Sequence, residues 1–295
     1  MALWRLHLKT AAQNRNNSIA YCINNNLAAI GWRVSSIPQT KFQYEELCLS
    51  EHKKRVSSCL FVKEIEIGDL IWIRDTQGLY YIGKISSDWI YKTDDASILH
   101  DFPNQRNCIW KKIGNSSFVP GRIIAAFRSG KALNRIRDND IENLSEWLFN
   151  NSHTPKEKHL KTLSEKDINL LFKLVSDKDC EDIIASYLQV KKDYIIIPSS
   201  CEKHSQAYEF ILINKVTGKQ ASVQVKQGST DINANDLKNT ADKIYLFTTE
   251  GCILNDLNNM EIISKKSLTD FYNENMHLLT PKIKFWLSYL HYKSV

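Results

Sequence analysis

A predicted β-hairpin in the second half of the chain constrains the fold most. Residues 208–213 (YEFILI) and residues 221–228 (ASVQVKQG) are apolar segments separated by a turn that contains Thr-Gly-Lys at 217–219. Two such segments around a glycine-containing turn are typical of two antiparallel strands. Each segment also carries polar residues at positions where a buried strand is expected to carry none. These polar residues need a physical reason.

The polar residues of the hairpin are Glu209 in the first strand and Gln224 and Lys226 in the second. Side chains alternate along a strand, so Gln224 and Lys226 share one face of the sheet, while Val223 and Val225 point to the other. An acidic residue on one strand and a Gln-x-Lys pair on its neighbour can therefore meet at one place.

This combination of side chains has both a chemical and a structural interpretation. Oxygen ligands for a hard cation, with a lysine beside them to hold the attacking water, are what a metal-dependent phosphodiesterase needs. In the structural interpretation, Glu209 and Lys226 form a cross-strand ion pair at an exposed edge, which contributes at most about 1 kcal/mol. The apolar neighbours Val223 and Val225 favour the chemical interpretation, because an unpaired charge between them would be costly.

The residues from 176 to 251 resemble the PD-(D/E)xK nuclease superfamily, specifically its Mrr-like branch, whose second element often reads Gln-x-Lys. The parts of the family follow in order: a helix with a glutamate at 179–189, a strand at 193–200, the hairpin, and, at 241–251, the end of a helix that leads into a further buried strand. The resemblance implies a restriction endonuclease-like α/β sheet. It covers only the C-terminal half of the chain.

The resemblance also implies roles for individual residues. Glu209, Gln224 and the Val225 carbonyl would bind Mg²⁺ or Mn²⁺, Lys226 would position the attacking water, and Glu181 would assist from the helix. Two positions depart from the family: Glu209 stands where aspartate is usual, and Gln224 replaces the second acid. A neutral amide oxygen binds a metal less strongly than a carboxylate does, so we expect weaker metal affinity.

The length of 295 residues predicts two domains, since most domains contain about 100 to 200 residues. Residues 150–159 are polar, charged and interrupted by Pro155, as linkers are, and a short helix is predicted before them at 138–146. Ser164 starts a new amphipathic helix. We therefore predict a first domain at 1–147, a linker at 148–162 and a second domain at 163–295.

The first domain is predicted to be a small β-barrel. Its strand candidates are residues 3–8, 28–32, 70–74, 79–85, 109–113 and 123–127, with one helix near 43–49. Many short strands with few helices favour such a barrel. A Gly-Trp after an early strand, a Gly-Asp-x-Ile-Trp strand and a Tyr-x-Gly-x-Ile strand resemble the PUA-like barrels, which include EVE and related readers of modified bases. That resemblance implies nucleic-acid recognition.

Aromatic residues in the first domain are candidates for a base-binding pocket. Trp32 stands at the end of a predicted strand, after Gly31, and Trp89 and Tyr91 follow another strand. A reader of nucleic acid stacks an extruded base on such rings, and Asp88 could accept a hydrogen bond from the base. The alternative is that these rings fill the core, since tryptophans bury large areas in small barrels.

The net charge of +6 is concentrated in the first half of the chain. Residues 1–150 contain 20 Lys/Arg and 15 Asp/Glu, while the remaining residues contain 19 and 18. The segment 121–137 contains no acid and five cations. Its proposed nucleic-acid contacts are Arg122, Arg128, Lys131 and Arg135. Such a run is expected of a phosphate-contacting surface, although a solvated helix face would have the same composition.

Composition also predicts the compartment. Seven cysteines, an odd number without a Cys-x-x-Cys pair, indicate reduced thiols instead of disulfides or a zinc site. The N-terminus lacks the apolar core of a signal peptide, and no apolar stretch approaches the length of a membrane span. We therefore predict a cytoplasmic protein with no membrane partner.

Together these features predict an endonuclease of the restriction or phage-defence type. Its first domain would recognise nucleic acid, expected to be double-stranded DNA, with a modified base as a candidate target, and its second domain would cut it. Two alternatives stay open: an inactive nucleic-acid-binding protein with a nuclease fold, and a nuclease effector gated by a nucleotide signal. The sequence is compatible with a homodimer but does not require one.

Overall fold

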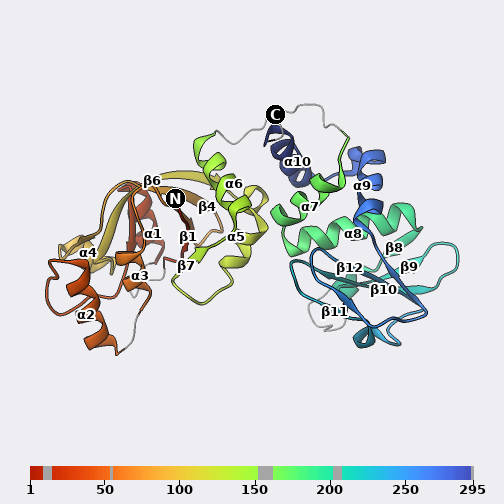
Figure 1. Ribbon diagram of the computed structural model, residues 1–295, viewed down its shortest axis with the longest axis horizontal. Coiled ribbons are helices and arrows are strands. Elements are labelled where there is room, and N and C mark those ends of the chain that lie inside the picture. Colours follow the sequence, from red (N-terminus) through yellow and green to blue (C-terminus); the bar gives the residue numbers. More distant parts are fainter. Residues whose placement is uncertain (9–14, 54–55, 152–161, 202–207, 294–295) are drawn as a thin grey trace. The chain divides into compact units, whose positions relative to one another are not determined.

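The computed structural model describes residues 1–8, 15–53, 56–151, 162–201 and 208–293. They form two compact units, Met1–Thr154 and Pro155–Val295, which we call unit 1 and unit 2 (Figure 1). Most of the linker predicted at 148–162 lies outside the described residues, and its first residues belong to the last helix of unit 1. None of the described helices has both the length and the apolar character needed to cross a membrane.

Unit 1 combines seven strands with six helices among the described residues. The elements are β1 (Leu3–Leu6), α1 (Arg15–Asn24), β2 (Leu27–Ile30), α2 (Lys41–His52), α3 (Ser57–Lys63), β3 (Leu70–Arg74), β4 (Tyr80–Ile85), β5 (Ile90–Tyr91), α4 (Asp95–Leu99), β6 (Asn104–Gly114), α5 (Gly121–Ala126), β7 (Leu133–Ile136) and α6 (Asn139–Asn150). The sheet order is β2-β6-β4-β3-β1-β7, with β5 paired to β6. Only β1 and β3 pair in parallel among these strands.

Helices cover both faces of the unit 1 sheet. On one face, Trp4 and Ile71 are neighbours across β1 and β3 and belong to a core that also contains residues of α1, α2 and α3. On the other face, Trp72 is fully buried, and its indole nitrogen donates a hydrogen bond to Ser145 of α6 at 3.1 Å. Because side chains alternate along each strand, a single apolar strand contributes residues to the cores on both faces of the sheet.

Two expectations for the first domain need correction. Among the described strands, β2 and β7 end the sheet without pairing to each other, so the sheet is open where a closed barrel was predicted. The strand predicted at 123–127 lies in helix α5, which begins after Pro120. Ile123 and Phe127, four residues apart, are both buried on one side of that helix. The β-branched Ile123 and Ile124 and the aromatic Phe127 favour a strand locally, but tertiary packing selects the helix.

Unit 2 contains a mixed sheet with helices. Its elements are α7 (Glu165–Leu174), α8 (Asp177–Lys191), β8 (Tyr194–Ile196), β9 (Phe210–Asn214), β10 (Gln220–Lys226), β11 (Ile232–Asn233), β12 (Lys243–Thr248), β13 (Ile253–Leu254), β14 (Met260–Ile262), α9 (Lys265–Glu274) and α10 (Pro281–Lys293). The main sheet has the order β14-β12-β10-β9-β8, which places β10 at its centre. Strand β10 runs antiparallel to β9 and parallel to β12.

Helix α8 packs against the strands β8 and β10 of this sheet (Figure 1). It begins with a capping box, in which Ser176 and Asp179 exchange hydrogen bonds between side chain and backbone. Ile184 and Leu188, four residues apart on the helix, are buried, while Ile183 lines a pocket with Phe271 of α9. A capped start and an apolar stripe fix both where the helix begins and which face it turns to the sheet. The helix therefore holds its polar residues at defined places beside β10.

A buried carboxylate anchors the first strand of unit 1. Asp69 is 4% exposed and accepts hydrogen bonds from the backbone nitrogen of Ala2 at 2.7 Å, the indole nitrogen of Trp4 at 2.9 Å and the backbone nitrogen of Glu66 at 3.1 Å. Three donors from two separate segments thus converge on one side chain. Burial of these donors would be unfavourable without their acceptor.

Replacing Asp69 with Ala should destabilise unit 1 by roughly 3 kcal/mol, because it leaves buried donors unsatisfied at about 1 to 3 kcal/mol each. Urea unfolding followed by tryptophan fluorescence measures the loss. Asp75→Ala is the matched control, since Asp75 accepts two backbone hydrogen bonds within a partly exposed turn. An equal loss in both variants would show that burial of the Asp69 contacts is unimportant.

Candidate active site and nucleic-acid interface

The hairpin of unit 2 brings three of the predicted catalytic side chains together. One carboxylate oxygen of Glu209, Oε1, accepts hydrogen bonds from Gln224 Nε2 and from Lys226 Nζ, both at 3.0 Å. Glu209 directly precedes β9, and its backbone nitrogen donates to the Val223 carbonyl at 2.8 Å. The Glu209 side chain is 22% exposed and that of Lys226 36%. The pair is therefore accessible from solvent, but only in part.

Gln224 is the most deeply buried polar group of this cluster. The residue is 4% exposed, and its amide oxygen Oε1 has no hydrogen-bond partner among the described residues. A buried polar atom without a partner is uncommon and costs about 1 to 3 kcal/mol. The backbone of β10 adds a second oxygen: alternation along the strand directs the Val225 carbonyl to the same side as the Val223 carbonyl, where Glu209 lies.

Helix α8 contributes a second carboxylate and a second lysine. Glu181 and Lys178, three residues apart on the helix, form an ion pair at 2.5 Å. Burial raises the pKa of Glu181, the nearby charge of Glu209 raises it further, and Lys178 lowers it. The two carboxylates are thus close enough to interact electrostatically. Glu209, Gln224 and Lys226 thus contact one another, and Glu181 lies on α8, which packs against β10.

The oxygen atoms of this region fit a hard divalent cation. No three His, Cys, Asp or Glu side chains gather as a metal-binding group within the described part of the chain. The region offers instead two carboxylates, the unpartnered oxygen of Gln224 and the Val225 carbonyl. Mg²⁺ and related ions accept amide and carbonyl oxygens together with water. Such an ion would satisfy Gln224 Oε1, although with one anionic ligand fewer than a site with a further acid provides.

In unit 1, three aromatic rings lie around the buried Asn104. Trp89 and Tyr91 were predicted as pocket residues, and Tyr44 lies next to them. The ring centroid of Tyr44 lies 5.6 Å from that of Trp89 and 6.0 Å from that of Tyr91, and Trp89 and Tyr91 are 6.3 Å apart. Asn104 accepts a hydrogen bond from the Trp89 indole nitrogen at 3.0 Å and donates to the Tyr44 hydroxyl at 2.9 Å. We call Tyr44, Trp89, Tyr91 and Asn104 the aromatic cluster.

Trp32 lies next to the aromatic cluster, and its own backbone conformation is unusual. Its φ of 63° lies in the left-handed region, which is rare for a bulky residue. The Trp32 carbonyl lies 2.8 Å from the Tyr44 hydroxyl, and Asn104 donates to the Gly31 carbonyl at 2.8 Å. These bonds hold the strained turn in place, and strain of this kind concentrates at binding sites. Trp32, Trp89 and Tyr91 are all partly buried, so each also contributes to the core.

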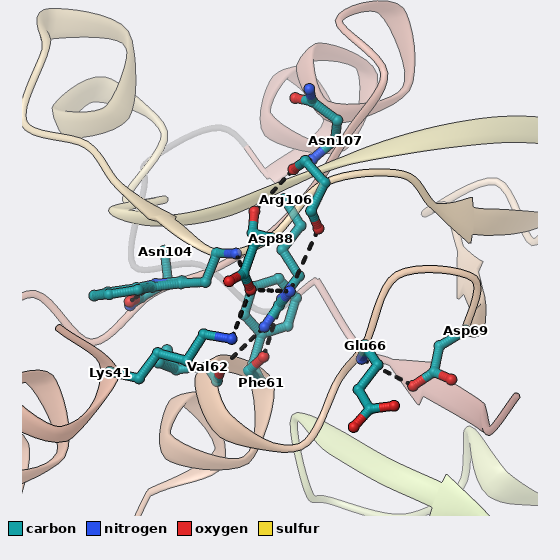
Figure 2. A network of polar contacts seen from close by, with 11 residues as sticks. Lys41, Phe61, Val62, Glu66, Asp69, Asp88, Asn104, Arg106 and Asn107 are labelled. Atoms are coloured by element: carbon teal, nitrogen blue, oxygen red, sulfur yellow. Dashed lines mark hydrogen bonds and ion pairs between the residues drawn. The ribbon is translucent and has the colours of Figure 1, made fainter.

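Asp88 is held at the edge of the cluster by cations (Figure 2). Its Oδ1 lies 2.6 Å from Lys41 Nζ and 3.1 Å from Arg106 NH1, while the Asp88 side chain is 64% exposed. The hydrogen bond from Lys41 lowers the pKa of Asp88. The carboxylate therefore stays ionised and acts only as an acceptor at neutral pH.

Arg106 is the buried member of this network. It donates to the carbonyls of Phe61 at 3.3 Å and Val62 at 2.8 Å, in the last turn of α3 (Figure 2). Carbonyls at the end of a helix lack partners within the helix, and a cation there is favourable. Arg106 thereby fixes α3 and the Asp88 segment to strand β6.

The four basic residues predicted to contact nucleic acid come from other elements. Arg122 lies on α5, Arg128 and Lys131 between α5 and β7, and Arg135 on β7, and all four are exposed. Strand β7 ends the sheet opposite to β2, whereas the aromatic cluster uses β5 and β6 near β2. The structure thus places Arg135 away from the predicted base pocket. The role of the basic residues in binding phosphate stays a prediction.

Several residues of both sites were not anticipated from the sequence. Tyr44, Asn104, Lys41 and Arg106 in unit 1 and Lys178 in unit 2 all contact predicted site residues. A signal was present at Asn104-Gln105-Arg106, three consecutive polar residues that begin a strand and are all buried.

Residues 4–122 match the model of a family described only as a domain of unknown function, DUF8426. No curated protein matches the chain. Among solved structures, the DNA modification-dependent restriction endonuclease AspBHI is similar over 77% of this chain and 69% of its own, with 10% sequence identity and a TM-score of 0.27. A TM-score this low does not establish a common fold.

The raised pKa of Glu181 predicts a pH-dependent stability. Because burial and Glu209 disfavour its ionised form, the stabilisation associated with protonated Glu181 is present at low pH and lost as pH rises through the folded-state pKa. Gln resembles the protonated acid at every pH. Glu181→Gln should therefore raise the thermal midpoint at pH 7 to 8, and this gain should disappear towards about pH 4, near the usual pKa of glutamate.

Differential scanning fluorimetry across this pH range measures the effect. Glu165→Gln, at an exposed position in the first turn of α7, is the control and should give no such gain at neutral pH. A difference between Glu181→Gln and wild type that grows as the pH falls would contradict the assigned direction.

Proposed function

We propose that this protein is a divalent-metal-dependent endonuclease. Unit 2 would hydrolyse phosphodiester bonds at the site formed by Glu181, Glu209, Gln224 and Lys226, and unit 1 would recognise nucleic acid, with double-stranded DNA as the proposed substrate. The observation that supports this most is the Gln224 amide oxygen, which is buried without a partner among the described residues, beside the Glu209–Lys226 pair. A cross-strand ion pair with only a structural role does not require an unpartnered amide oxygen beside it.

Each side chain of the site has a defined task in this proposal. Glu209, Gln224 Oε1 and the Val225 carbonyl would hold Mg²⁺ or Mn²⁺, which, when bound, neutralises phosphate charge and makes a bound water more acidic. Lys226 Nζ, now 3.0 Å from Glu209, would orient the attacking water by donating a hydrogen bond. Glu181, with its raised pKa, would accept a proton more readily than an exposed glutamate.

In unit 1, we propose that the aromatic cluster and Trp32 receive a base, with a modified base as a candidate target. Stacking on aromatic rings can compensate the cost of unstacking a base, at about 1 to 3 kcal/mol per ring. The ionised Asp88 would accept a hydrogen bond from an amino or imino group of that base. The exposed cations of α5 and β7 would contact phosphates, which carry no sequence information themselves.

One specific observation favours a second candidate function. The site contains an amide where a further carboxylate would bind metal better, and the described residues contain no group of three metal-binding acids, histidines or cysteines. A protein with these features could bind nucleic acid through a nuclease fold without cutting it. Cleavage by the wild-type protein in Mg²⁺ or Mn²⁺, with none in a chelator, separates the two functions.

Lys226→Ala should abolish cleavage, with a loss of at least about 100-fold, the scale of a positioned proton-transfer or water-orienting group. Nucleic-acid binding and the thermal midpoint should change little, because the lysine is partly exposed and does not pack in the core. Nicking and linearisation of a supercoiled plasmid in Mg²⁺ and Mn²⁺ measure the rate.

The matched control is Lys219→Ala, which removes an exposed lysine from the other end of the same hairpin and should cleave like wild type. Cleavage by Lys226→Ala at the wild-type rate would refute the assignment of this site.

Trp89→Ala should weaken recognition of the preferred base by roughly 5- to 150-fold, the loss expected when one stacking ring worth about 1 to 3 kcal/mol is removed. Binding that depends only on phosphates should persist, and so should slow, unselective nicking by unit 2. Fluorescence anisotropy with modified and unmodified duplexes, at one fixed salt concentration, measures the discrimination.

Trp110→Ala is a close control for the loss of a half-buried tryptophan. Trp110 packs against the same core and donates its indole hydrogen to the Leu27 carbonyl at 2.9 Å, but it does not belong to the aromatic cluster. Equal loss of discrimination in both variants, with equal destabilisation, would identify Trp89 as a core residue and not a base contact.

A further inference from the structure

Gln227 directly follows the proposed catalytic lysine, and its side chain reaches another element. Its amide nitrogen Nε2 donates to the Phe172 carbonyl at 2.8 Å and to the Val175 carbonyl at 2.6 Å. Phe172 lies in the last turn of α7, and Val175 is the residue that ends this helix. Carbonyls at such a position have no partner within the helix. Both hydrogens of one amide are thus used to fix the end of α7 to the end of β10.

The end of α7 is also the start of the helix that carries Glu181. Ser176, the next residue after Val175, is the N-cap of α8 and exchanges hydrogen bonds with Asp179. Asp179 in turn forms an ion pair with Lys282 of α10 at 2.6 Å, with both side chains less than a fifth exposed. No loop separates the carbonyls held by Gln227 from the first turn of α8. Movement at Gln227 would therefore move Lys178 and Glu181.

On its other side, the Gln227 segment is fixed to the central sheet. The Lys226 carbonyl accepts from the Thr249 backbone nitrogen at 3.1 Å, and the Gly228 nitrogen donates to Thr249 Oγ1 at 2.7 Å. Residues 226–228 are thus tied to the end of β12. Gln227 bridges the two halves of the site, the strand with Lys226 and the helix with Glu181.

The same helix provides a comparison at its other end. Asn273 of α9 donates to the Leu163 carbonyl at 3.0 Å and accepts from the Leu163 nitrogen at 2.7 Å, just before α7 begins. Side-chain amides therefore hold both ends of α7 with two hydrogen bonds each. If Gln227 only satisfied helix carbonyls, replacing it should have the same effects on the protein as replacing Asn273. Gln227 differs from Asn273 because it lies between Lys226 and the start of α8.

We propose that Gln227 is a positioning residue, which sets the distance between the Glu181 helix and the Glu209–Lys226 strand pair and thereby the metal affinity and turnover of the site. This inference rests on the proposed nuclease function. It goes beyond that function because the Gln227 amide bonds to carbonyls of α7, and not to the proposed metal ligands or the lysine head group, so that it acts through the backbone of that helix.

The test compares Gln227→Met with Asn273→Leu in the full chain. Each change keeps most of the side-chain volume and removes one amide clamp of α7. Both variants should lose similar thermal stability. Only Gln227→Met should weaken Mn²⁺ binding, measured by calorimetry, by about 10- to 100-fold, as loss of an outer positioning contact does. Its kcat for plasmid cleavage should fall by a similar factor, while its KM for DNA stays unchanged.

A second variant shortens the side chain but keeps an amide at this position, and its effect should be intermediate. Gln227→Asn retains the donors but lacks one methylene, so it can reach only one of the two carbonyls, and its Mn²⁺ affinity should lie between wild type and Gln227→Met. This variant decides the question if Gln227→Met does not fold.

The outcomes separate the inference from the function on which it rests. Wild-type Mn²⁺ affinity and kcat in both Gln227 variants would overturn the positioning role and leave the nuclease assignment intact. Parallel losses of metal affinity in Gln227→Met and Asn273→Leu would assign Gln227 to general stability and also overturn it. Failure of the wild-type protein to bind Mn²⁺ or to cleave would overturn the proposed function, and the inference with it.

Discussion

The structure depends throughout on one constraint: a polar group inside the protein must find a partner, and in this chain the partner belongs to a distant segment. Arg106 of β6 satisfies carbonyls of α3, and Asp69 gathers donors from β1. Gln227 does the same for α7. The hydrophobic effect has no preferred direction, whereas these hydrogen bonds do. They fix the register between elements that the hydrophobic cores only bring together.

The proposed active site is the place where this constraint is least fulfilled. Gln224 Oε1 is buried without a partner in the described residues, and two carboxylates lie near enough for one to raise the pKa of the other. Lys178 and Lys226 each pair with one of these acids. Unfavourable local electrostatics within a well-packed frame are typical of functional sites. In the proposed function, Lys226 would exchange Glu209 for the attacking water, which a purely structural ion pair would have no reason to do.

The sequence predicted unit 2 better than unit 1, for physical reasons. Alternation along β10 depends on neighbouring residues, so the meeting of Gln224, Lys226 and Glu209 could be expected from the strand pattern alone. The capping residue Ser164 likewise marks the start of α7 locally. In unit 1, Asn104 bonds Gly31 across 73 positions, and no local pattern encodes such a partner. The helix α5 was predicted as a strand because its Ile123-Ile124 pair has strand propensity, while its burial depends on distant residues.

The position of β1 in the sheet of unit 1 has a consequence for biosynthesis. Among the described strands of unit 1 it comes earliest in the chain, yet it lies inside the sheet, between β3 and β7, with Leu3 opposite Ile136. Its partner β7 leaves the ribosome more than a hundred residues later. Unit 1 cannot complete its sheet during most of its own translation, and the edge of β1 that pairs with β7 stays without that partner in the interval. The order of synthesis thus makes the first strand to emerge among the last to be fully paired.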